Sequence, residues 1–122
     1  MNIAIIGASA KQERMSNKAV RAYRDQGHRV FPVNPKEQEI EGIPCHASIQ
    51  DIREPIDRVS VYVNPEIGMT LAEGIAAKRP RELFLNPGSE SETLIAKFRE
   101  LGLEPVMKCS ILDIGIHPEE MK

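Results

Sequence analysis

The residues best suited to bind a ligand stand directly after four short apolar runs. Gly7-Ala8-Ser9 follows the first run, Asn34-Pro35-Lys36 the second, Val63-Asn64-Pro65 lies at the end of the third, and Asn86-Pro87-Gly88 follows the fourth. Glycine lets a backbone approach a ligand closely, and amides just before a helix suit a phosphate group. We therefore expect a phosphate-bearing ligand at the glycine turn. Turn formation alone explains each Asn-Pro pair equally well, because both residues favour turns.

A small group of cations accompanies these segments. Lys11 and Arg14 follow the glycine turn, and Lys36 follows the second apolar run. A domain that binds NAD usually has Asp or Glu at the end of its second strand, where this chain has Asn34. A lysine at this place instead favours a ligand with an additional phosphate. Each cation taken alone is as well explained as an ordinary solvated side chain.

Candidate catalytic groups are few. His28, His46 and His117 fall in a turn, a loop and the tail, where surface histidines are more frequent than catalytic ones. Cys109 follows the last apolar run beside Lys108, and a neighbouring cation stabilises a thiolate. A small buried thiol is nevertheless the favoured interpretation. An enzyme that uses Cys109, or an NAD(P)-type oxidoreductase, is the alternative to a binding protein.

The alternation of apolar runs with helical stretches predicts the elements that position these groups. Continuous apolar runs, typical of strands buried on both faces, cover 2–6, 29–33, 59–63, 82–85 and 104–107. Helices are predicted from residue 16 to Gly27, over 66–78 and over 91–101. We also expect a short extended piece at 43–45, a helical turn at 49–53 and a loosely held tail from Cys109.

This succession predicts an α/β fold. We expect a Rossmann-like, doubly wound parallel sheet of five strands in the order 3-2-1-4-5, within three α/β/α layers. Ligands of such folds bind beyond the carboxyl ends of the strands, which is where the four polar segments would meet.

Composition is that of an ordinary soluble domain. The 122 residues make one domain, 1–122, with 41% hydrophobic and 28% charged residues. The net charge of −2 argues against nucleic acid, which requires concentrated positive charge. No apolar run approaches the ~20 residues that span a bilayer, and two cysteines are too few for a disulfide scaffold or a zinc site. We expect a cytoplasmic protein with no metal site and no nucleic-acid or membrane partner.

Several segments together resemble a known family. They are Gly7-Ala8-Ser9, Arg14-Met15-Ser16-Asn17, Val33-Asn34-Pro35-Lys36, Gly42-Ile43-Pro44-Cys45 and Cys109 near the last strand. This set is similar to that of the small stand-alone CoA-binding domain proteins, and through them to the N-terminal CoA-binding domain of the succinyl-CoA synthetase α subunit. The resemblance covers nearly the whole chain. It implies a Rossmann-like domain that binds coenzyme A. Our own expectation is a module that binds coenzyme A or an acyl-CoA without catalysis, in a regulatory role, as a homodimer or with a partner protein.

The resemblance also implies which part of CoA each segment meets. The CoA phosphates would contact the glycine turn and its cations, namely Gly7, Ala8, Ser9, Ala10, Lys11 and Arg14. Asn34 and Lys36 would lie beside the phosphorylated ribose or the diphosphate. Val63 and Pro65 would flank the adenine, and the turn Asn86–Gly88 would face the pantetheine.

Overall fold

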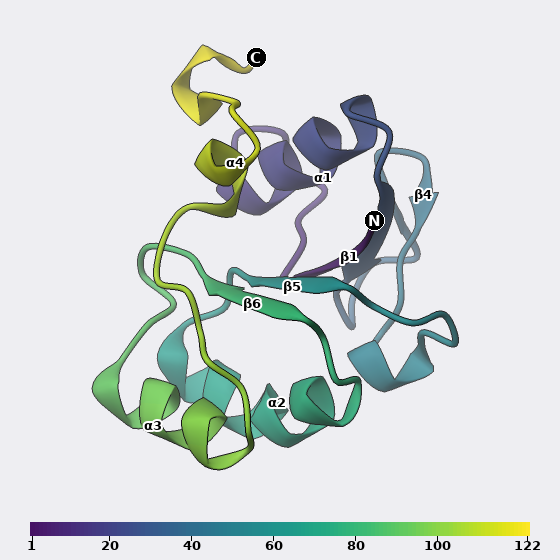
Figure 1. Ribbon diagram of the computed structural model, residues 1–122. Coiled ribbons are helices and arrows are strands. Elements are labelled where there is room, and N and C mark those ends of the chain that lie inside the picture. Colours follow the sequence, from purple (N-terminus) through teal and green to yellow (C-terminus); the bar gives the residue numbers. More distant parts are fainter.

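A parallel sheet of four strands forms the centre of the molecule (Figure 1). The computed structural model describes all residues, Met1–Lys122. The strands are β1 (Asn2–Ile6), β2 (Arg29–Val33), β5 (Arg58–Val61) and β6 (Glu82–Leu85), in the order β2-β1-β5-β6. β1 is buried from its second residue onward, which explains its unbroken apolar sequence.

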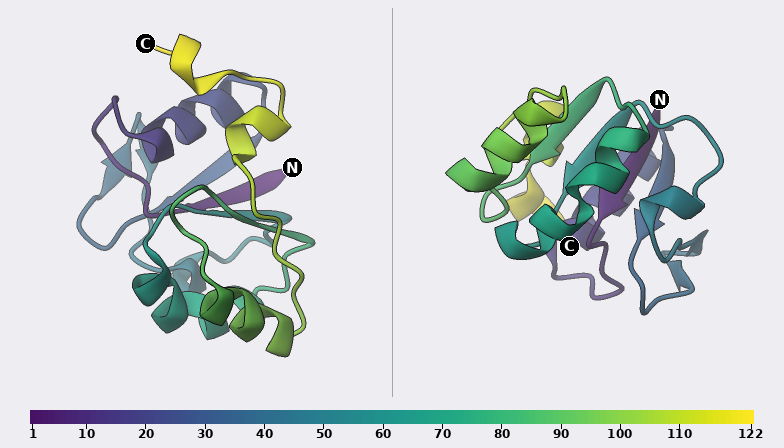
Figure 2. Two further views of the ribbon diagram at one scale, coloured as in Figure 1. Left: turned by 90° about the vertical axis from the view of Figure 1, so that its left-hand side faces the viewer. Right: turned by 90° about the horizontal axis from the view of Figure 1, so that it is seen from below.

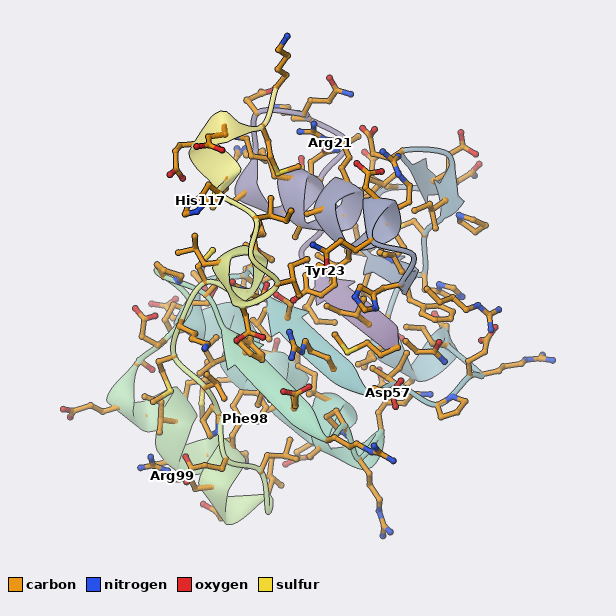
Figure 3. All side chains as sticks on the ribbon, turned by 45° about the horizontal axis from the view of Figure 1, so that its top comes forward. Arg21, Tyr23, Asp57, Phe98, Arg99 and His117 are labelled. Carbon is orange, nitrogen blue, oxygen red and sulfur yellow. The ribbon has the colours of Figure 1, made fainter.

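Helices cover both faces of the sheet (Figure 2). α1 (Met15–Asp25) and the short α4 (Ser110–Asp113) lie on one face, and α2 (Pro65–Ala77) and α3 (Glu92–Glu100) on the other. Each face has its own core, and the labelled side chains of Tyr23 and Phe98 mark the two cores in Figure 3. The three expected layers are therefore confirmed.

The long helices begin where the sequence predicts, within two residues. Asn64 caps α2, because its Oδ1 accepts a hydrogen bond from the Ile67 N–H at 2.9 Å. Ser91 caps α3 in the same way, through the Leu94 N–H at 3.0 Å. Pro65 occupies the first turn of α2, where its missing N–H costs nothing.

The remaining elements are short. An antiparallel hairpin of β3 (Glu39–Ile40) and β4 (Ile43–Pro44) follows β2, and the 3₁₀ turn η1 (Ile49–Asp51) precedes β5. They correspond to the predicted extended piece at 43–45 and the predicted helical turn at 49–53. A second 3₁₀ turn, η2 (Pro118–Glu120), lies near the end of the chain. None of the helices combines the length and the apolar character that crossing a bilayer requires.

The predicted strand order 3-2-1-4-5 is wrong. It placed the run 59–63 beyond β2, whereas this run forms most of β5 and pairs with β1. The place beyond β2 is taken by one parallel bridge between Val33 and His46. If this bridge is counted as the third strand position, the strand order follows the dinucleotide-binding pattern. The order then changes direction between β1 and β5. A single bridge has no apolar run to mark it in the sequence.

The fifth predicted strand, 104–107, is likewise reduced to a bridge. Only Val106 of this segment bonds to β6, through its N–H to the Leu83 carbonyl at 2.8 Å and through its carbonyl from the Leu85 N–H at 2.9 Å. The chain then turns into α4 four residues later. The sheet therefore has four strands rather than five.

The segment after Cys109 begins with a buried turn rather than as a loosely held tail. Ser110 and Ile111 are completely buried. The Ser110 N–H donates to Asn86 Oδ1 at 2.9 Å, and the Tyr23 hydroxyl donates to the Ser110 carbonyl at 2.7 Å. These bonds fix the start of α4 against the sheet, which corrects the expectation of a loose tail.

Candidate functional site

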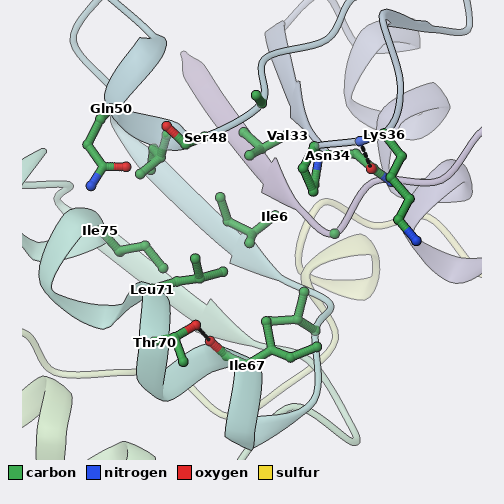
Figure 4. A pocket seen from close by; sticks show the side chains of 15 residues that line it. Ile6, Val33, Asn34, Lys36, Ser48, Gln50, Ile67, Thr70, Leu71 and Ile75 are labelled. Carbon is green, nitrogen blue, oxygen red and sulfur yellow. Dashed lines mark hydrogen bonds between the residues drawn. The ribbon is translucent and has the colours of Figure 1, made fainter.

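A pocket of about 550 Å³ opens at the carboxyl ends of β1 and β2 (Figure 4). Its size suits a small organic ligand or part of a larger one. Its walls come from the ends of both strands, from the segment around η1 and from α2. The hydrophobic wall residues are Ile6, Val33, Ala47, Ile49, Val63, Ile67, Leu71 and Ile75, the polar ones are Asn34, Lys36, Ser48, Gln50 and Thr70, and Gly7 and Pro35 complete the lining.

Helix α2 supplies one long wall of this pocket. Ile67, Leu71 and Ile75 are spaced by four residues, so they share one helix face. Ile75 is fully buried, whereas Ile67 at the mouth is 46% exposed. The Thr70 hydroxyl donates to the Ile67 carbonyl at 2.6 Å, so its polar atom is engaged by the helix backbone. The wall thus offers open apolar surface at its Ile67 end.

Gly7 allows the loop after β1 to pass close to Val63. Its φ is +81°, and a Cβ at this position would lie 2.8 Å from Val63 Cγ1. Only glycine fits both constraints. The N–H groups of Gly7 and Ala8 donate to the Val33 carbonyl at 3.0 and 3.2 Å. These two amides are therefore used within the protein and are not open to a phosphate.

The next part of the loop has open amides and exposed cations. The N–H groups of Ser9 and Ala10 have no acceptor in the protein. Lys11 and Arg14 are exposed and form no salt bridge. The loop leads into α1, whose N-terminus has no side-chain cap and carries a partial positive charge. Residues 9–14 thus combine two open amides with two unpaired cations and the exposed Glu13.

The three Asn-Pro asparagines all form hydrogen bonds inside the protein. Asn34 Nδ2 donates to the Ala8 carbonyl at 2.8 Å, and its Oδ1 accepts from the Lys36 N–H at 2.8 Å. Asn34 thereby joins the loops that follow β1 and β2. Asn64 caps α2, and Asn86 is buried and bonded to β5. Turn and capping chemistry accounts for Asn64 and Asn86, whereas Asn34 also lines the pocket.

Lys36 is the cation at the rim of the pocket (Figure 4). It is exposed and forms no salt bridge. It is the third residue after β2, and it lines the pocket beside Asn34. The charge of Lys36 is thus not neutralised by an acidic side chain of the protein.

The structure brings together part of the predicted site. Gly7, Asn34, Lys36 and Val63 line the pocket, and the loop of Ala8, Ser9, Ala10, Lys11 and Arg14 adjoins it. Three predicted residues lie elsewhere. Pro65 lines a separate, polar cavity between the starts of α2 and α3, Asn86 lies buried beneath α4, and Gly88 is in an exposed turn.

Sequence reasoning missed two walls of the pocket. The segment 47–50 carries no motif, and it reaches the pocket only through the tertiary fold. The stripe on α2 is visible in the sequence as Ile67, Leu71 and Ile75, but the same spacing is typical of a core-facing helix. The exposure of Ile67 is what separates the two interpretations, and exposure is a property of the structure.

Neither thiol lines the pocket. Cys109 is 8% exposed at the start of α4, and Lys108 forms an ion pair with Asp113 at 2.7 Å. Cys45 Sγ lies 3.7 Å from the Asn34 carbonyl oxygen. Burial raises the pKa of the Cys45 thiol above its usual range, so this thiol stays protonated at neutral pH.

Comparisons with known proteins give the family of the chain. The model of the CoA binding domain family matches residues 1–115. The chain belongs to the CoA binding domain family. A relative in Bacillus subtilis, the uncharacterized protein YneT, is 28% identical over 109 residues, which are 89% of this chain and 81% of that protein.

The same CoA-binding domain occurs within larger enzymes. An ADP-forming acetate–CoA ligase of Methanocaldococcus jannaschii is 36% identical over 66 residues, which are 54% of this chain and 9% of the ligase. The chain thus corresponds to a small part of that ligase. Among solved structures, a hypothetical protein from Pyrococcus horikoshii superposes with a TM-score of 0.87 and 31% identity, over 93% of this chain and 80% of that one.

Proposed function

We propose that this domain binds coenzyme A or an acyl-CoA, with the adenine in the pocket between β1, β2 and α2. The observation that carries the proposal is an apolar pocket of about 550 Å³ with the unpaired Lys36 at its rim, in a chain of the CoA binding domain family. Adenine is flat and has two apolar faces. Val63 on the strand side and Ile67 and Leu71 on the helix side suit those faces.

In this proposal some cations contact the 3′-phosphate of CoA and others contact its diphosphate. The ribose is attached to the adenine, so its 3′-phosphate emerges at the rim of the pocket, where Lys36 stands. The diphosphate on the 5′ side continues towards the loop 9–14, with its open amides, Lys11 and Arg14. In this proposal the turn Asn86–Gly88 borders the pantetheine.

The module carries out no reaction on CoA in this proposal. It acts in the cytoplasm by regulating a partner protein, or by presenting CoA to it or to a second copy of the chain. The absence of either thiol from the pocket lining supports a binding role for the pocket.

Calorimetric titration with CoA and with dephospho-CoA tests the proposal. We expect Lys36→Ala to weaken CoA binding about tenfold, because it removes one charge-assisted contact of about 1.5 kcal/mol. Dephospho-CoA, which lacks the 3′-phosphate, is expected to bind the wild type and Lys36→Ala equally. Arg81→Ala is the matched control, since Arg81 is an exposed cation without a salt bridge at the opposite end of the sheet.

Two results would count against the proposal. If neither ligand binds the wild type below about 1 mM, CoA is not the ligand. If Lys36→Ala weakens both ligands equally, Lys36 does not contact the 3′-phosphate.

A further inference from the structure

The tip of the β3–β4 hairpin has an unfavourable backbone conformation. Glu41 and Gly42 form a two-residue turn, with φ of +53° and +74°. Such turns favour Asn-Gly or Gly-Gly, because other residues rarely adopt positive φ. Glutamate at the first position has a conformational cost, and it persists only where its surroundings hold it. The contacts of the Glu41 side chain therefore bear on function.

The Glu41 carboxylate reaches from the hairpin to the loop before α1. Its Oε2 accepts hydrogen bonds from Asn17 Nδ2 at 3.1 Å and from Gln12 Nε2 at 3.4 Å. The side chain is only 15% exposed, and Arg24 Nη1 lies 3.9 Å from its other oxygen. The hydrogen bond from Asn17 is the main reason that the pKa of Glu41 lies below its usual range. The group is thus a carboxylate at neutral pH.

Asn17 and Arg21 extend these contacts to both ends of the loop segment 9–12, which contains the open amides of Ser9 and Ala10. Asn17 is completely buried, and its Nδ2 also donates to the Ser9 carbonyl at 2.9 Å. Its Oδ1 accepts from Arg21 Nε at 2.8 Å, and Arg21 Nη2 donates to the Gln12 carbonyl at 2.9 Å. Side chains therefore hold the backbone at Ser9 and at Gln12, and Glu41 closes this network through Asn17 and the Gln12 side chain.

We propose that Glu41 is a positioning residue that fixes the loop 9–12 in the shape that receives the CoA diphosphate. This inference rests on the proposed CoA binding. Glu41 does not contact the ligand, and it acts through Asn17 and Gln12. The hairpin begins three residues after Lys36, so Glu41 joins the segment that meets the 3′-phosphate to the loop that meets the diphosphate.

The variant Glu41→Asn separates positioning from folding. Asparagine accepts positive φ more readily than glutamate, and it is one methylene shorter and uncharged, so the fold is retained while the contact to the loop is lost. Two ligands are titrated by calorimetry. CoA meets both the pocket and the loop, whereas adenosine 3′-monophosphate carries the adenine and the 3′-phosphate but no diphosphate.

We expect Glu41→Asn to raise the Kd for CoA at least fivefold and to leave the Kd for adenosine 3′-monophosphate within twofold. Amide hydrogen exchange at residues 9–12 is expected to become faster in the same variant. Glu41→Gln keeps the length of the side chain and an oxygen acceptor, and it is expected to retain more CoA affinity than Glu41→Asn. Arg79→Gly is the matched control, because Arg79 is the other non-glycine residue with positive φ, at +50°, and it lies far from the loop in sequence.

Three outcomes overturn the role of Glu41. They are unchanged CoA binding by Glu41→Asn, equal weakening of both ligands, and the same selective loss in Arg79→Gly. If the wild type binds neither nucleotide, the proposed function itself fails. If the wild type binds both and Glu41→Asn binds CoA unchanged, only the positioning role fails.

Discussion

The two faces of the sheet are built differently, and β5 shows the contrast within one strand. Val59 and Val61 point to the face of α2 and α3, where they belong to a core of apolar side chains. Arg58 and Ser60 point to the face of α1 and α4, where they join buried hydrogen-bond networks. Directional bonds thus fix the second face, whereas non-directional apolar contacts hold the first face, beside which the pocket lies.

Arg58 is the centre of the polar face. Its side chain is 8% exposed and forms ion pairs with Glu82 and Asp113, both at 2.9 Å. Its Nη1 also donates to the Tyr23 hydroxyl at 2.9 Å. Burial raises the pKa of Tyr23 above its usual range, so this hydroxyl stays neutral and donates to the Ser110 carbonyl. One side chain thus links β5, β6, α1 and α4.

The largest expected effect comes from breaking this centre. Arg58→Ala leaves the Asp113 carboxylate and the Tyr23 hydroxyl without their buried partner, and we expect a loss of about 3–5 kcal/mol in the free energy of unfolding. Urea denaturation measures it. On the apolar face, Lys97→Ala removes the more exposed ion pair to Glu73, and we expect a loss of at most about 1 kcal/mol. Equal losses in the two variants would contradict the contrast between the faces.

An intermediate effect is expected on the apolar face, and it concerns binding rather than stability. Ile67→Ser removes half-exposed apolar surface at the mouth of the pocket, and we expect CoA affinity to fall about fivefold, or about 1 kcal/mol. The unfolding free energy is expected to change by less than about 1 kcal/mol. The matched control is Leu112→Ser, because Leu112 is 50% exposed on α4. Equal CoA affinity in wild type and Ile67→Ser would exclude this wall from the adenine site.

The smallest expected effect is a pH dependence on the polar face. Hydrogen bonds from Lys108 and then Arg58 hold the pKa of Asp113 below its usual range. A carboxyl group with a lowered folded-state pKa adds stability above its unfolded pKa of about 4, and this contribution is lost as the pH falls through the folded value. Asp113→Asn is therefore expected to be less stable than wild type at pH 7, and the difference should shrink below about pH 4. A constant difference across this range would show that the charge of Asp113 contributes nothing.

Local patterns predict the fold wherever an element is long enough to show its period. The runs at 2–6, 29–33 and 82–85 and the three long helices are placed correctly, because each buries a recognisable face. The third and the fifth sheet positions each rest on a single residue, His46 and Val106, so neither has a period to detect. The prediction of five strands and their order failed at these two places.

The candidate site was predictable only where turn chemistry and the strand ends coincide. Gly7, Asn34 and Lys36 combine both signals, and the structure places them in one pocket lining. Asn86 carries the same turn signal, but its side chain is buried by Ser110, a contact that depends on α4. The contact of these residues with CoA stays a prediction.

Pro32, the fourth of the five residues of β2, has a consequence for the solubility of the protein. Its carbonyl points away from β1 and accepts from the His46 N–H at 2.9 Å, so its missing N–H belongs to the outer edge of the sheet. Beyond the single bridge at Val33, that edge is not covered by another strand. An intruding strand needs a continuous row of donors and acceptors, and proline interrupts the row. Pro32 thus protects the folded chain from edge-to-edge aggregation.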